Sequence, residues 1–207
     1  MQLDHVLIAV DDLATAAKAL ETTSGLSAVA GGRHAAWGTG NMIVPLGDAY
    51  IELVSVLDRT KAQESVFGRW VGAASSNRGR PIGWAVRTHH LDDIAQRLGL
   101  ATEAGSRATS AGTVLRWRTS GMARAVAEPS LPFFIEWAPD TPLPGTAVVR
   151  HPAGPAKIAR LILEGDASRL SSWLGDHRLP IVIRPGSPAV AGIAVSIGLD
   201  EVLLGVS

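Results

Sequence analysis

The stretch Leu3-Asp-His-Val-Leu-Ile-Ala-Val-Asp-Asp-Leu13 is an apolar run that one imidazole interrupts and that ends at two aspartates suited to cap a helix. It predicts a β-strand from Leu3 to Val10. Successive side chains of a strand point to opposite faces, so His5 shares a face with Leu7, whereas Asp4 points the other way. We therefore expect His5 to be buried, and a buried imidazole needs a hydrogen-bonding partner or a metal ion.

The composition is that of a turn-rich globular protein. Hydrophobic residues make up 46% of the 207 positions and charged residues 18%, with 22 Gly and 12 Pro, which argues against disorder. Nineteen basic residues balance nineteen acidic ones. A net charge of zero without a Lys/Arg run provides no attraction for nucleic acid or an anionic membrane, and we expect neither partner.

The chain contains no Cys, which excludes disulfides, thiolate nucleophiles and zinc-thiolate sites. Any metal would have to be bound by His, Asp and Glu. The amino terminus has no basic segment followed by an apolar one, and no apolar run approaches the ~20 residues that span a bilayer. We expect a cytoplasmic protein.

The first part of the chain predicts a βαβββ module over residues 1–56. Gly25 follows a helical stripe of apolar residues and marks the end of a helix. Residues 57–80 lose the strand pattern and predict a connector that contains a helix. The expected elements of the module are a strand at Leu3–Val10, a helix at Leu13–Thr23 and strands at Ser27–Gly31, Met42–Leu46 and Tyr50–Val56.

A second βαβββ module is expected over residues 81–138, because an offset of 78 positions pairs the two helical stripes, for example Leu13 with Leu91. Its strands are expected at Ile82–Thr88, Val114–Thr119 and Phe133–Trp137. A Pro-rich linker at 139–155 then precedes a third, shorter βαβββ-like module at 156–207, for which we expect a structural role. The predicted fold class is α+β, with tandem βαβββ modules.

Two glutamates stand at similar places in the two modules. Glu52 interrupts an apolar strand, and Glu136 lies between Ile135 and Trp137 in the same way. A buried carboxylate must be hydrogen-bonded, paired with a cation or bound to a metal. Two interpretations stay open: these are satisfied polar groups of a cavity, or with His5 they form a site for a divalent metal.

A Gly-rich loop and one strand of the second module supply further candidates. The loop Gly31-Gly-Arg-His-Ala-Ala-Trp-Gly-Thr-Gly-Asn41 offers an imidazole, a hydroxyl and an amide to a ligand. We expect five residues to contribute to ligand binding: His34, Thr39, Asn41, Arg116 and Trp117.

These motifs resemble those of the vicinal oxygen chelate superfamily, and most closely its glyoxalase-like branch. The resemblance rests on LDHVLIAVDDL, GGRHAAWGTGN, IVPLGDAYIELVSV, PIGWAVRT and LPFFIEW. It implies paired βαβββ modules that curl into a cup, with ligands from the first and last strands of each module. Members include glyoxalase I, extradiol dioxygenases, epimerases and antibiotic-sequestering proteins.

Carried over residue by residue, the resemblance implies metal ligands at His5, Glu52 and Glu136, with Zn, Ni, Mn or Mg as the metal. The sequence departs from the pattern at the fourth position: the offset of 78 places Gly83 opposite His5, and an alignment of Ala9-Val10 with Ala85-Val86 places Pro81 there. Neither Gly83 nor Pro81 has a ligating side chain. Dioxygenase chemistry, which uses two His and one carboxylate, is therefore disfavoured.

The functional expectation is a protein that binds a small organic molecule in the cup. A divalent metal would polarise a carbonyl for lyase or isomerase chemistry, with Glu52 or Glu136 as the catalytic residue that moves a proton. The alternative is a metal-free binding or sequestering protein without catalysis. The sequence leaves the formation of a homodimer open.

Overall fold

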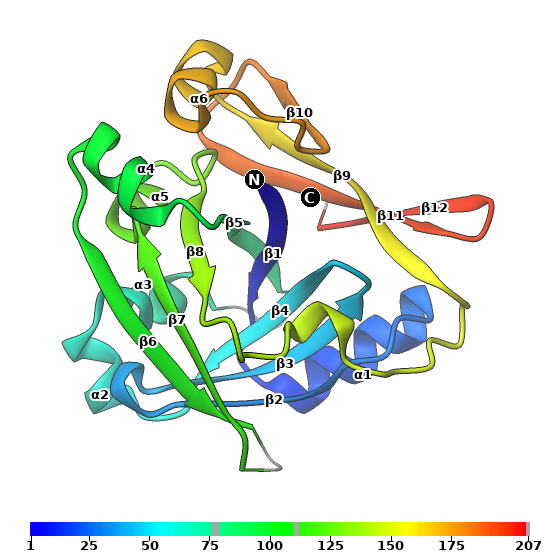
Figure 1. The fold of residues 1–207 in the computed structure, drawn as a ribbon. Helices are drawn as coiled ribbons and strands as arrows, with labels where there is room; N and C mark the ends of the chain where they lie inside the picture. Colours follow the sequence, from blue (N-terminus) through cyan, green and yellow to red (C-terminus); the bar gives the residue numbers. More distant parts are fainter. Residues whose placement is uncertain (76–78, 110–111, 206–207) are drawn as a thin grey trace.

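The computed structural model describes residues 1–75, 79–109 and 112–205, in which eight strands close into a barrel and four form a separate small sheet (Figure 1). The strand order is β1-β4-β3-β2-β6-β7-β8-β5 in the barrel and β10-β9-β11-β12 in the small sheet. The expected α+β class with a curled mixed sheet is confirmed.

The first module has a βαβββ order. Asp12 caps its helix by accepting a hydrogen bond from the Thr15 backbone N–H at 2.8 Å, and Gly25 ends the helix with a φ of 67°, a left-handed conformation that favours glycine. The elements are β1 (Gln2–Ala9), α1 (Leu13–Ser24), β2 (Val29–His34), the short 3-10 helix η1 (Ala35–Trp37), β3 (Thr39–Leu46) and β4 (Ala49–Val56).

The second module follows a connector that contains α2 (Arg59–Glu64) and α3 (Val66–Ala74). Two of its elements were not anticipated, the strand β6 and the helix α5. The sequence TEAGSRA of β6 lacks the apolar alternation by which strands are recognised. The elements are β5 (Arg80–Arg87), α4 (Leu91–Leu98), β6 (Thr102–Ala108), β7 (Val114–Ser120), α5 (Met122–Ala127) and β8 (Phe133–Trp137).

The two modules close the barrel at two seams of very different extent. β1 and β5 pair antiparallel along most of their length, whereas β2 and β6 are joined by one residue pair, Arg33 with Ala108. The expected cup is therefore a closed barrel within the described residues. An eight-stranded barrel has an interior just wide enough for side chains to fill.

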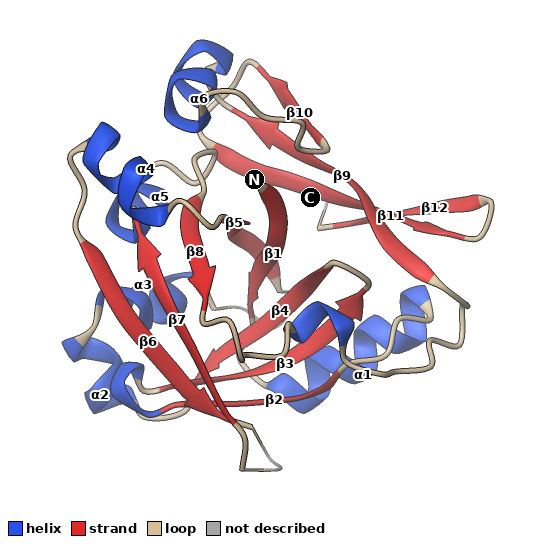
Figure 2. Cartoon of the chain, viewed as in Figure 1, coloured by secondary structure: helices blue, strands red, loops and turns tan. Residues whose placement is uncertain are grey.

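The third unit has the expected order of strands and helix, but its strands pair differently from those of the first module. β9 pairs parallel with β10 through the helix α6 and antiparallel with β11, so the first strand lies inside the sheet (Figure 2). In the first module, the first strand instead pairs with the last. The elements are β9 (Ala156–Glu164), α6 (Ala167–Leu174), β10 (Ile181–Arg184), β11 (Ala189–Ile197) and β12 (Asp200–Leu204).

The segment between the second and third units holds the 3-10 helix η2 (Pro144–Thr146) and is anchored to the first module by His151. The His151 Nδ1 accepts a hydrogen bond from the Ser27 backbone N–H at 3.0 Å, and its Nε2 lies 2.8 Å from the Pro45 carbonyl oxygen. Both ring nitrogens of this buried imidazole are thus satisfied. None of the helices in the described part of the chain is long and apolar enough to cross a membrane.

Two apolar clusters lie on opposite sides of the barrel wall. Leu7, Val54 and Phe133 belong to the inner cluster, whereas Leu3 and Phe134 belong to an outer cluster shared with the third unit and the helices. The inner cluster surrounds the polar residues that form the candidate site.

Candidate functional site

A buried carboxylate lies between two imidazoles inside the barrel. The Glu52 Oε2 lies 3.5 Å from the His5 Nε2, and the Glu52 Oε1 lies 4.0 Å from the His34 Nε2. Asn41 donates a hydrogen bond from Nδ2 to the Glu52 Oε1 at 2.6 Å. The structure therefore brings together four residues that the sequence indicated separately.

A second carboxylate joins this group because β1 is irregular. The pairing of β1 with β5 shifts by one residue between Leu3 and His5, which makes Asp4 the extra residue of a β-bulge. Asp4 is therefore buried, and its Oδ1 lies 2.6 Å from the His5 Nδ1. The expectation that Asp4 and His5 point to opposite faces is wrong, because a bulge interrupts the alternation.

Asp4 is held by groups from the second module. The Trp137 Nε1 donates a hydrogen bond to the Asp4 Oδ2 at 3.0 Å, and the Arg87 Nη1 lies 3.7 Å from the same oxygen. Because the Asp4 carboxylate accepts a hydrogen bond, the His5 Nδ1 carries a proton, which leaves Nε2 as the ring nitrogen that faces Glu52.

His34 is a neutral imidazole. Burial lowers its pKa to about 4, the positive charge of Arg107 and the neighbouring His5 act in the same direction, and the negative charge of Glu52 opposes them. Its Nδ1 lies 3.0 Å from the Thr39 Oγ1. At neutral pH, His34 is therefore uncharged and can donate a hydrogen bond from one ring nitrogen and accept one at the other.

Two further residues of the cavity escaped the sequence reasoning. Tyr50 stacks on the His5 ring with a centroid distance of 4.7 Å, and burial, assisted by Asp4 and Glu52, raises its pKa well above the usual value. Arg107 lines the same cavity from β6 and is 6% exposed. The polar sequence of β6 gave no sign that its arginine points into the barrel.

Aromatic side chains enclose the polar group. The Trp37 ring lies 4.9 Å from that of Phe67 and 6.0 Å from that of Trp117, and Trp137 lies 5.4 Å from Trp117 between ring centroids. The remaining cavity has a volume of about 30 Å³. This is the space of about one water molecule, so a larger ligand needs a side chain to move.

Glu136 does not belong to this site. In β8, Phe133, Ile135 and Trp137 line the cavity, and Glu136 lies between them on the outer face. It accepts a hydrogen bond from Arg118, which also donates to Asp92 at 2.8 Å, and the two carboxylates raise the pKa of that arginine. The expected convergence of Glu136 with His5 and Glu52 is wrong, because a shift of one residue in a strand reverses the face.

The other ligand-binding candidates divide between the inside and the outside of the barrel. His34, Asn41 and Trp117 line the cavity, and Thr39 supports His34 from behind. Arg116 is exposed on the outer face of β7, so its expected place in the cavity is wrong.

The residues do not fit the metal site that the resemblance implies. At Gly83, the indole of Trp70 fills the space where a ligand would stand, since a Cβ at this position would collide with its ring. The inward positions of β8 are apolar. Among the described residues, no three or more His, Asp or Glu side chains form a group able to hold a metal ion.

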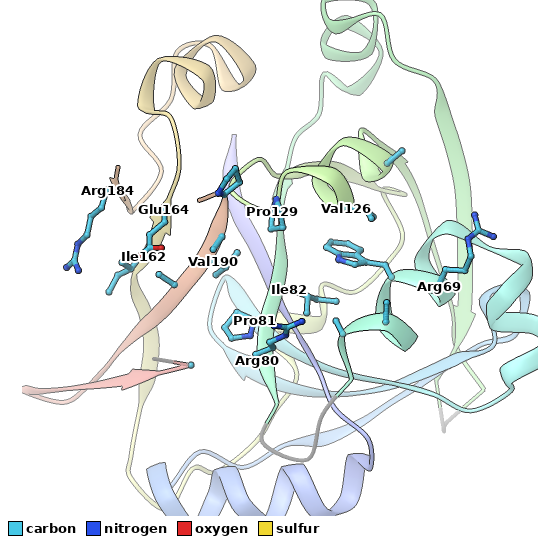
Figure 3. Close-up of a pocket in the computed structure, with 18 of the residues that line it drawn as sticks. Arg69, Arg80, Pro81, Ile82, Val126, Pro129, Ile162, Glu164, Arg184 and Val190 are labelled. Carbon is cyan, nitrogen blue, oxygen red and sulfur yellow. The ribbon is translucent and has the colours of Figure 1, made fainter. Parts of the chain in front are cut away.

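A larger groove of about 1010 Å³ lies outside the barrel, between β5, α3 and α5 on one side and the third unit on the other (Figure 3). Arg69, Arg80 and Arg184 stand along it over an apolar floor that includes Ile82 and Val190. Its described lining has no histidine and one carboxylate. The buried group of two carboxylates and two imidazoles described above lies inside the barrel instead.

The chain is similar to several solved structures. A hypothetical protein from Staphylococcus aureus is 14% identical with a TM-score of 0.64, and the match covers 98% of this chain and 84% of that one. The methylmalonyl-CoA epimerase of Mycobacterium tuberculosis is 24% identical with a TM-score of 0.45, over 66% of this chain and 88% of that one. The Streptomyces coelicolor epimerase in complex with 2-nitronate-propionyl-CoA is 18% identical with a TM-score of 0.46, over 68% and 96%.

The Staphylococcus aureus match, at 14% identity, establishes a shared fold and not a shared chemistry. No curated protein matches this sequence. The family model described as "Glyoxalase-like domain" matches residues 3–177, which include the whole barrel. The resemblance drawn from the sequence motifs is confirmed, and the chain belongs to the glyoxalase-like domain family.

Proposed function

We propose that this protein binds a small carbonyl compound inside the barrel and moves a proton at the carbon next to the carbonyl, with Glu52 as the base. One observation carries the proposal: Glu52 stands between the Nε2 atoms of His5 and His34, at 3.5 and 4.0 Å, with Asp4 behind His5. A buried carboxylate flanked by imidazoles in the wall of a cavity is suited to general acid–base catalysis.

The two oxygens of Glu52 have different tasks. The Glu52 Oε1 accepts the hydrogen bond from Asn41 at 2.6 Å. The Glu52 Oε2 faces the His5 Nε2 at the longer distance of 3.5 Å and is the oxygen available to a substrate. The substrate C–H bond breaks, its proton passes to the Glu52 Oε2, and the electron pair is delocalised into the enolate. Return of the proton to the same or the opposite face of that carbon restores or inverts its configuration.

His5 extends the path of the proton. Its Nε2 accepts the proton from Glu52, and the Asp4 carboxylate stabilises the imidazolium that results, as in other carboxylate–imidazole pairs. No step of this path passes through a metal ion, because the donor set of the barrel does not fit one. Metal analysis of the purified protein separates this chemistry from the metal-assisted form that the sequence suggested.

The experiment follows the exchange of C–H protons for deuterium by NMR in D2O, with a panel of small 2-oxo acids, 2-hydroxy ketones and malonic half-thioesters. We expect exchange at the carbon next to the carbonyl with the wild type, and a loss of about 100-fold or more with Glu52→Gln. Glu64→Gln on the exposed side of α2 is the matched control. Exchange that survives in Glu52→Gln would overturn the proposal.

A sequestering protein without catalysis is the second candidate, and the aromatic lining of the cavity favours it, since aromatic walls would hold a ligand tightly. Such a protein would bind members of the panel without exchanging their protons. Glu52→Gln would then change affinity alone.

A further inference from the structure

We infer that Arg107 binds a carboxylate of the ligand, so that this protein acts on small anionic carbonyl compounds. The inference rests on the proposed function, since it names the substrate class of the same cavity. It is carried by a separate observation, the unsatisfied hydrogen-bonding capacity of one buried guanidinium.

The Arg107 side chain is buried in the barrel with no acidic partner. Its Nη1 is shielded from solvent and has no hydrogen-bond partner among the described residues. No carboxylate of the described chain lies within 4.0 Å of its guanidinium nitrogens, and the residue is 6% exposed. A buried charge without a partner is costly, so a native protein keeps one where a ligand supplies the partner.

The second buried arginine of the barrel shows the contrast. Arg87 donates hydrogen bonds to the Gln2 Oε1 at 2.5 Å and to the Asp48 carbonyl oxygen at 3.4 Å, and it lies 3.7 Å from the Asp4 Oδ2. Arg87 is therefore a structural cation, whereas Arg107 is left without such contacts.

The two buried acids of the barrel are already engaged. Asp4 is held by His5, Trp137 and Arg87, and Glu52 is held by Asn41 between the two imidazoles. Neither acid comes within ion-pair distance of Arg107. Among the described residues no acid is available to Arg107, and we assign that place to an acidic group of the ligand.

The space around Arg107 selects the kind of anion. Gly32 on β2 lies beside the guanidinium: a Cβ there would collide with the Ala108 carbonyl oxygen and lie 3.1 Å from the Arg107 Nη1, so a larger residue would press on the arginine. The planar guanidinium matches a carboxylate through two parallel hydrogen bonds. The cavity of about 30 Å³ must widen for any ligand larger than water, and a planar carboxylate requires less widening than a tetrahedral phosphate.

The position of Arg107 also orients the substrate. Arg107, Glu52 and His5 line one cavity, so a carboxylate on the arginine leaves the neighbouring carbon close to the base. Arg107 would then be a specificity-determining residue that distinguishes acids from their amides and esters.

The test measures binding of pyruvate, 2-oxobutyrate and malonate by calorimetry, with pyruvamide and inorganic phosphate as comparison probes. The proteins are the wild type, Arg107→Met, Arg107→Lys and Arg33→Met. Arg33 is exposed on β2 and pairs with Ala108, next to Arg107, so it controls for the loss of a positive charge. Thermal unfolding followed by circular dichroism shows that each variant folds.

We expect Arg107→Met to weaken carboxylate binding at least about tenfold, Arg107→Lys to retain part of it, and Arg33→Met to leave it unchanged. Pyruvamide should bind wild type and Arg107→Met equally weakly. Equal carboxylate binding by wild type and Arg107→Met would overturn the inference, as would binding of none of the three acids or Arg107-dependent binding of phosphate alone.

Failure of the two proposals can be told apart. If the acids bind through Arg107 but show no deuterium exchange, the anion site stands and the proton transfer does not. If Glu52-dependent exchange occurs with neutral carbonyl compounds and Arg107→Met leaves it unchanged, the proton transfer stands and the anion site does not.

Discussion

The Asp4 Oδ1 lies 2.6 Å from the His5 Nδ1, although the two residues are neighbours in one strand. In a regular strand their side chains would point to opposite faces. The β-bulge at this point of β1 turns both into the barrel, where the carboxylate fixes which ring nitrogen carries the proton. The free nitrogen of His5 then faces Glu52.

Asp4→Asn should change the tautomer of His5 while the barrel stays folded. An amide can offer its N–H to Nδ1, which would move the ring proton to Nε2 and remove the acceptor that faces Glu52. We expect deuterium exchange of the substrate to fall about 10- to 1000-fold. Nitrogen-15 NMR of the imidazole reports the tautomer, and Asp92→Asn on the exposed start of α4 is the control. An unchanged tautomer with unchanged exchange would contradict this role for Asp4.

Glu136→Gln should leave deuterium exchange and ligand affinity unchanged, because Glu136 lies on the outer face with Arg118. The Arg118 side chain is 43% exposed, so loss of this pair should cost about 1 kcal/mol of the free energy of unfolding or less. Urea unfolding and the exchange assay measure the two effects. A loss of exchange in a fully folded Glu136→Gln protein would show that this carboxylate reaches the reaction.

The stability of the protein should fall between about pH 6.5 and pH 4 because of His34. Burial holds its pKa at about 4 in the folded state, against 6.5 as the ordinary value, so the unfolded chain binds a proton in this window and the folded one does not. The loss of stability should be absent above pH 6.5 and should reach about 3 kcal/mol once the pH has fallen to 4, at about 1.4 kcal/mol per pH unit.

Urea unfolding of the wild type and of His34→Gln at several pH values isolates this effect. The difference between the two proteins should change with pH across the window and be constant above it. A constant difference at all pH values would mean that His34 titrates normally in the folded state.

Trp37→Ala should admit water to the polar group. The Trp37 ring covers His34, with 5.4 Å between ring centroids, and closes the cavity together with Phe67. We expect the indole N–H of Trp137, which donates to the buried Asp4, to exchange with solvent at least about tenfold faster in the variant. NMR of the indole protons measures this rate. The indole of Trp173, which donates to the Pro132 carbonyl oxygen outside the barrel, is the internal control and should not change.

Much of the fold was readable from local patterns. The apolar run before Asp11, the capping residues and the offset between the helical stripes predicted the α+β class and the first two modules, because such signals depend on neighbours in the chain. They also indicated His5, Glu52, His34, Asn41 and Trp117, which share one cavity. A polar group in an apolar strand needs a partner, and that requirement is visible without coordinates.

The third unit shows where local patterns stop being sufficient. Its order of elements was predicted, but the same order is compatible with different strand pairings, and the packing of β9 and β11 against the barrel selects one of them. The closure of the cup at β2 and β6 likewise depends on a contact between residues 33 and 108, which are far apart in the chain.

For three residues, only the tertiary structure determined whether the side chain points into the cavity. Glu136 was assigned to the cavity from a repeated pattern, but register decides the face of a strand, and an alignment uncertain by one residue cannot determine register. Asp4 entered the cavity through a bulge that arises from pairing with β5. Arg107 lies in a strand whose polar sequence has no periodicity, so only the closed barrel reveals that its charge is buried and has no acidic partner among the described residues.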